Sequence, residues 1–137
     1  MSDENPLNDL YMDRHDVDQQ ALRDVLSGLI GIDSESGDPI YLDAYFELGN
    51  KQRFVAQLLF REASVILGER EESEQGAASG AFAEHLDSSG SAVQNYSGDL
   101  EFVESDESRG GYVIRPHHVQ AAVSYLKDAR EQVQSDA

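Results

Sequence analysis

Three places in the chain group side chains that could bind a metal ion. His117 and His118 are adjacent, residues 13–16 read Asp-Arg-His-Asp, and residues 33–38 carry three carboxylates. Adjacent histidines at a helix start are expected to point in different directions, and no histidine four residues further on completes a facing pair. The 33–38 loop is too short for the closing glutamate of an EF-hand, and chance clustering in an acidic chain explains the 13–16 group. We therefore expect no metal site.

Patterns for covalent catalysis or cofactor binding are also missing from the sequence. No serine lies in a G-x-S-x-G elbow, and neither a P-loop nor a G-x-G-x-x-G run occurs. The absence of cysteine excludes a thiol nucleophile, a thiolate metal site and a disulfide scaffold. We expect that the protein is not an enzyme and that it uses no cofactor.

Residues 78–115 are predicted to form two short helices and a hairpin, which carry the remaining candidate functional side chains. Apolar residues at helical spacing predict one short helix over 78–86 and a second over 91–100, and Ser91 is the expected N-cap of the second. Residues 87–90 form the turn between them. Two runs rich in β-branched and aromatic residues, 101–104 and 111–115, predict a hairpin closed by a polar loop.

This order of helix, turn, helix and hairpin resembles the winged-helix family of archaeal DNA-binding proteins over about residues 50–130. Residues 81–86 (AFAEHL) with 87–93 (DSSGSAV) resemble its helix-turn-helix, and 102–105 with 111–114 resemble its wing. In that family the second helix lies in the major groove and the wing touches the DNA backbone. The resemblance implies a regulator that binds double-stranded DNA, with base contacts carried over by position to Ser91, Gln94, Asn95 and Ser97. The cations that could contact phosphates are Lys51, Arg53, Arg109 and Arg115.

The net charge of this region argues against DNA binding, although its amide side chains are suited to contacting bases. Gln94 and Asn95 can each pair bidentately with adenine, whereas Gly98 costs about 1 kcal/mol relative to alanine inside the same helix. From residue 77 to 119 there are two cations and seven anions, a net charge of −5. Phosphate neutralisation by cations normally supplies most nonspecific affinity. The alternative is therefore a winged-helix module that has lost DNA binding and binds a protein partner.

The whole chain is strongly acidic, with 27 Asp and Glu against 10 Lys and Arg and a net charge of −17. This composition is similar to that of cytosolic proteins of salt-loving archaea. Self-repulsion at high net charge is relieved by concentrated salt, so we expect folding to depend on salt. The N-terminus lacks the basic and apolar regions of a signal peptide, and no run of 18 apolar residues occurs. We expect a cytoplasmic protein without membrane contact.

Apolar periodicity predicts three further helices, at 19–30, 51–67 and 117–129. The helix at 51–67 is the expected core helix, with Asn50 as its cap and Gly68 in the left-handed position after its end. Residues 69–77 have the polarity of a solvated linker. Residues 40–48 are ambiguous between a helix and an extended segment, and we favour the helix.

The expected fold class is mainly α with a small β-hairpin, a winged helix-turn-helix with extra N-terminal helices. We expect a flexible arm at 1–17, an accessory helical segment at 18–49, the winged-helix domain at 50–130 and a tail at 131–137. The apolar stripe of the 117–129 helix predicts a homodimer, although the same stripe would serve equally well to close the core of a monomer.

Overall fold

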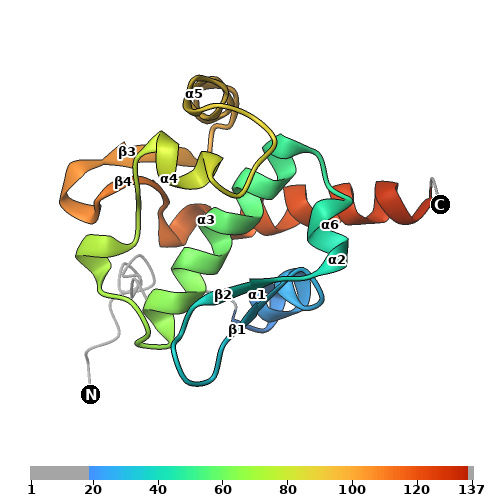
Figure 1. Ribbon diagram of the computed structural model, residues 1–137, viewed down its shortest axis with the longest axis horizontal. Coiled ribbons are helices and arrows are strands. Elements are labelled where there is room, and N and C mark those ends of the chain that lie inside the picture. Colours follow the sequence, from blue (N-terminus) through green and yellow to red (C-terminus); the bar gives the residue numbers. More distant parts are fainter. Residues whose placement is uncertain (1–18, 136–137) are drawn as a thin grey trace, which may run out of the picture.

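The computed structural model describes residues 19–135, which form a mainly helical fold with two small antiparallel strand pairs (Figure 1). The predicted arm at 1–17 lies outside the described residues, as does the end of the predicted tail. The elements are α1 (Gln19–Leu26), β1 (Ile30–Ile32), β2 (Pro39–Tyr41), α2 (Asp43–Phe46), α3 (Asn50–Ile66), η2 (Glu72–Glu74), α4 (Ser79–Ala83), α5 (Gly90–Asp99), β3 (Val103–Asp106), η3 (Glu107–Arg109), β4 (Gly111–Ile114), η4 (Pro116–His118) and α6 (Val119–Ser135). The mixture of helices and small strand pairs agrees with the expected α+β class. None of the helices in this part of the chain is long and apolar enough to cross a membrane.

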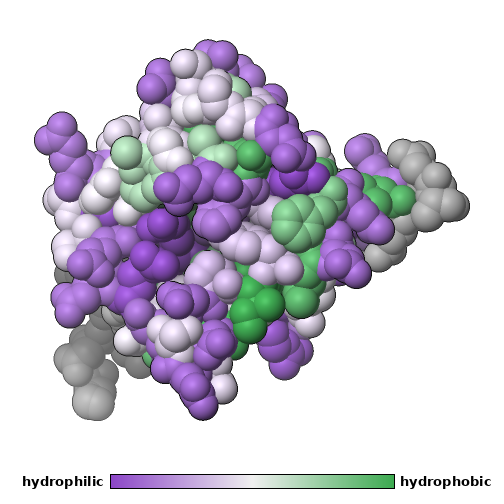
Figure 2. Space-filling model, in the orientation of Figure 1, coloured by the Kyte–Doolittle hydropathy of each residue, from purple (hydrophilic) through white to green (hydrophobic). Residues whose placement is uncertain are grey.

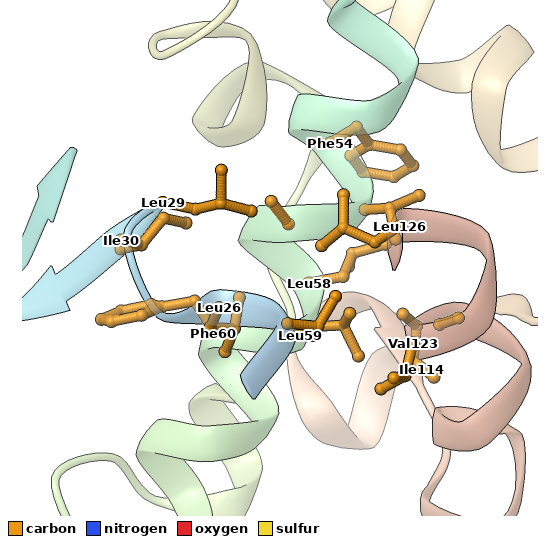
Figure 3. Packing of buried hydrophobic residues seen from close by; sticks show 14 of the residues in the cluster. Leu26, Leu29, Ile30, Phe54, Leu58, Leu59, Phe60, Ile114, Val123 and Leu126 are labelled. Atoms are coloured by element: carbon orange, nitrogen blue, oxygen red, sulfur yellow. The ribbon is translucent and has the colours of Figure 1, made fainter. Parts of the chain in front are cut away.

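Helix α3 runs through the middle of the molecule, and the other helices pack around it (Figure 1). Its core side chains are almost completely inaccessible: Phe54 and Leu59 are 0% exposed and Leu58 is 1% exposed. Figure 3 shows them between residues of α6, such as Leu126, and residues from α1 and the turn after it, such as Leu29. Each fully buried side chain of this size contributes roughly 1.5–3 kcal/mol. The predicted core helix is therefore confirmed.

The predicted apolar stripe of the last helix closes the core of the chain itself. Val119, Ala122, Val123 and Leu126 are all at most 5% exposed and belong to the same core as α3. The expectation of a homodimer through 117–129 rests on this stripe, which is already covered within one chain. The helix also continues to Ser135, so much of the predicted tail is helical.

The N-terminal part of the fold differs from its prediction. The helix expected over 19–30 ends at Leu26, where the Leu29 N–H donates to the Leu26 carbonyl and turns the chain. Residues 30–32 then pair with residues 39–41, so the helix favoured over 40–48 is divided into β2 and the short α2. The turn between the strands is held by Asp33, whose carboxylate accepts the N–H groups of Glu35 and Ser36. These hydrogen bonds lower the pKa of Asp33.

Two predicted helix caps and the predicted linker also need correction. The N-cap of α3 is Gly49, and the side chain of Asn50 instead accepts the Asp87 N–H at 3.0 Å. The N-cap of α5 is Ser89 rather than Ser91. Gly68 has the predicted left-handed conformation, with φ of 78°. The linker at 69–77, however, is not merely solvated, because it contains η2 and the almost fully buried Gln75.

Candidate nucleic-acid interface

Helices α4 and α5 pack beside the first half of α3 and present one face to solvent. The ring of Phe82 from α4 is fully buried and meets Phe54 of α3 edge-on, with ring centroids 5.1 Å apart. In α5, Val93 is fully buried and Leu100 follows at the helix end with 7% exposure. The helix is thereby fixed along one side. In Figure 1 it stands at the edge of the molecule, away from β1 and β2.

Three of the four candidate base-contacting side chains lie in the open on α5. Ser91, Gln94 and Asn95 are exposed. Ser97 is half-buried, and its hydroxyl donates to the Gln94 carbonyl of the same helix at 2.8 Å. The face opposite the buried Val93 therefore offers two amides and one hydroxyl as hydrogen-bonding groups.

The two candidate phosphate-contacting cations of α3 are paired within the chain. The Lys51 ammonium contacts the Asp99 carboxylate at 3.2 Å, and the Arg53 guanidinium contacts the Asp87 carboxylate at 3.0 Å. Arg53 is 8% exposed and also donates to the Phe46 carbonyl. Because it is covered, Arg53 is not placed to receive a phosphate, whereas Lys51 is about one-third exposed.

The two candidate cations of the hairpin are also engaged. Arg115 donates to Glu104 and, at 3.2 Å, to Asp106. Its hydrogen bond to Glu104 raises the pKa of Arg115, and the Ser108 hydroxyl lowers the pKa of Asp106, so both groups stay charged. Arg109 was also expected to contact a phosphate. Its side chain is only 7% exposed and turned inward, so it is not placed to do so.

The inward position of Arg109 reveals a buried polar network that sequence reasoning missed. Its guanidinium donates to the Gln75 side-chain oxygen, and the Gln75 amide nitrogen donates to the Glu62 carboxylate at 2.6 Å. The three side chains are between 1% and 7% exposed. The network fastens η3 and η2 to α3. No periodic pattern marks it, because its members come from three separate segments: η3, the residue after η2, and α3.

A second buried network supports the turn between α4 and α5. The Tyr45 hydroxyl donates to the His85 carbonyl at 2.8 Å and accepts from the Gln57 amide at 3.0 Å. Gln57 also donates to the Phe82 carbonyl at 3.2 Å. Burial raises the pKa of Tyr45, so this hydroxyl remains protonated and able to donate.

The face around α5 carries several exposed carboxylates. Asp87 precedes the helix, Asp99 ends it, and Glu101 follows it. Asp99 and Asp87 have side-chain exposures of 62% and 84% even though each is paired with a cation. The exposed face of α5 therefore presents neutral amide groups that are surrounded by carboxylates.

His117 and His118 do not diverge as expected, because their ring centroids are only 4.2 Å apart. Within residues 19–135, no group of three or more His, Asp or Glu side chains is placed to hold a metal ion. Comparison of the chain with protein-family models, with curated proteins and with solved structures found no match.

Proposed function

We propose that the protein is a winged-helix module that binds duplex DNA through α5. The order α3, α4, α5, β3, β4 and α6 supports this, as does the bridge from Ala77 to Tyr112, which adds a short third pairing to the hairpin. The observation that carries the proposal is the two-sided character of α5. Val93 fixes one side of the helix to the core, and the exposed amides of Gln94 and Asn95 are free to meet base edges on the other.

The acidic surface is compatible with this proposal at high salt. At about 1 M salt, charges more than about 3 Å apart are screened, so repulsion between the chain and DNA phosphates is weak. Hydrogen bonds from amides to base edges do not depend on net charge. We therefore propose that the protein reads sequence through neutral groups, with Lys51 and Arg115 as the partly exposed cations nearest to the DNA.

The test of the function is selection of duplexes from a random pool at about 2 M KCl. We expect the wild type to enrich a short recurrent site, and we expect the double change Gln94→Ala, Asn95→Ala to abolish that enrichment. Each bidentate amide contact is worth about 1–3 kcal/mol of base discrimination, so preference for the site should fall roughly 10-fold or more.

Gln120→Ala is the matched control for this double variant, because it removes an exposed amide from α6, on a different helix. It should select the same site as the wild type. Equal selectivity of the double variant and the wild type would disprove the base-reading role. A wild type that enriches no site would count against DNA binding itself.

The ion pair between Lys51 and Asp99 keeps one cation of α3 from contacting DNA freely. Asp99→Asn removes the carboxylate at the end of α5 and frees the Lys51 ammonium, so we expect tighter DNA binding. One additional phosphate contact should steepen the dependence of log affinity on log salt by about 1. Binding titrations at several KCl concentrations measure this slope. Glu131→Gln removes the same charge from an exposed position on α6 and should leave the slope unchanged.

A second candidate function is binding of a basic protein partner by the same face. The observation in its favour is that the four candidate cations are all engaged by groups of the chain, whereas Asp87, Asp99 and Glu101 are exposed. Under this alternative the wild type enriches no DNA site. It instead retains a protein partner that is lost when these three carboxylates are changed to amides.

A further inference from the structure

An open apolar groove lies between α1, β1 and the second half of α3. Its volume is about 890 Å³, within the range of grooves that bind ligands or partners. Its walls are largely aliphatic and aromatic, with Leu22, Leu26, Ile32, Phe60 and Ile66 among them. Fifteen of the residues between 19 and 135 line it; none of these fifteen is acidic, and Arg23 is the one charged residue among them. The chain has 27 acidic residues among 137, so the composition of the groove differs from that of the chain as a whole.

Exposed apolar side chains border this groove. Leu42 and Leu67 line it and are 38% and 62% exposed, and Ile40, 46% exposed, lies on β2 opposite Gly31 of the groove. Figure 2 shows hydrophobic surface over β2 and toward α2, in a molecule that is otherwise mostly hydrophilic in this view. A recess and protruding apolar groups thus lie next to one another on one face. A surface of that kind can be complementary to itself.

We propose that a second copy of this chain covers the groove, so that two chains pair through the face formed by α1, β1, β2 and the end of α3. Each chain carries a net charge of −17, so contact between two copies is least opposed where carboxylates are fewest. The groove is such a place, because none of the lining residues in the described part of the chain is acidic. A basic partner would instead be drawn to the carboxylates elsewhere on the surface.

This pairing leaves the candidate DNA face uncovered. Lys51, at the start of α3, contacts the last residue of α5, whereas Ile66 and Leu67, at the other end of α3, line the groove. A helix of this length spans about 25 Å. The inference does not rest on the proposed function, since it concerns the opposite end of α3 and is measured without DNA.

Sedimentation and light scattering at about 2 M KCl test the proposal. We expect the wild type to be a dimer at micromolar concentration, with a melting temperature that rises with protein concentration. Leu67→Glu puts a carboxylate from each chain into the interface and should weaken association at least 10-fold. Its side chain is 62% exposed in one chain, so the fold itself tolerates the change.

Leu67→Met is the matched control and should remain dimeric, because it keeps an apolar side chain of similar volume. A wild type that stays monomeric overturns the proposal, and so does a Leu67→Glu variant that dimerises as tightly as the wild type. A monomer whose groove takes up an apolar fluorescent probe would assign the groove to a small apolar ligand and would also overturn it.

Discussion

Gly111→Ala is expected to destabilise the fold by about 3 kcal/mol or more, because the hairpin touches the preceding chain segment at this residue. A Cβ atom at position 111 would lie 2.3 Å from the Ala77 carbonyl oxygen and 2.5 Å from its carbon. The backbone there also has φ of 141°, a conformation that side chains with a Cβ rarely adopt. Alanine must therefore push the chain at Ala77 away from β4 and break the hydrogen bond from the Tyr112 N–H to the Ala77 carbonyl. Thermal unfolding should show a melting temperature lower by roughly 10 °C or more.

Gly98→Ala is the matched control, since it makes the same chemical change in an open place. Apart from the adjoining residues and the backbone of its own helix, no atom lies within 4 Å of a Cβ built at position 98, which is inside α5. Alanine should therefore stabilise the protein by about 0.5–1 kcal/mol through its higher helix propensity. Equal melting temperatures for Gly111→Ala and the wild type would show that the contact between Ala77 and β4 is not maintained in solution.

The long helices and the second hairpin could be predicted because their patterns are long or locally complete. Helix α3 was predicted to within one residue at each end, since its apolar side chains repeat over four turns. The helix predicted over 19–30 extended too far, into the first residue of β1, because apolar side chains keep helical spacing up to Ile30. A three-residue strand is too short to show the alternation of apolar and polar side chains that would distinguish it from a helix. Its pairing with β2, seven residues further on, decides the conformation.

The exposed groups of the candidate site could be predicted, but their neighbours could not. Gln94 and Asn95 fall opposite Val93 and Leu100 by helical spacing alone, so their exposure follows from the local pattern. The partners of the cations depend on contacts between distant segments. Lys51 meets a carboxylate 48 residues away, and no local pattern specifies such a pair. Arg109 was misjudged for the same reason, because its partner Gln75 lies in a segment with the composition of a linker.

Gln75→Leu is expected to cost about 3 kcal/mol or more, because this side chain joins two buried ionisable residues. Gln75 is 1% exposed; its oxygen accepts from Arg109, and its nitrogen donates to Glu62. Leucine has a similar volume, so the change leaves no large cavity and mainly removes hydrogen bonds. Glu62 and Arg109 are 3% and 7% exposed. Water can therefore take the place of the lost amide beside them only if the segment that contains η2 opens. Chemical denaturation should therefore show a lower midpoint for this variant.

Gln120→Leu is the control for Gln75→Leu, because it makes the same substitution at an exposed position on α6. Its effect should stay within about 0.5 kcal/mol, as is usual for surface changes. If both variants unfold at the wild-type midpoint, the network does not hold η2 and η3 on α3. If Gln75→Leu is destabilised as expected, its hairpin should also be the first region to lose amide protection, because Arg109 is the link from η3 to this network. Hydrogen exchange at Tyr112 and Val113 would then rise before exchange in α3, and uniform exchange across both regions would contradict this order.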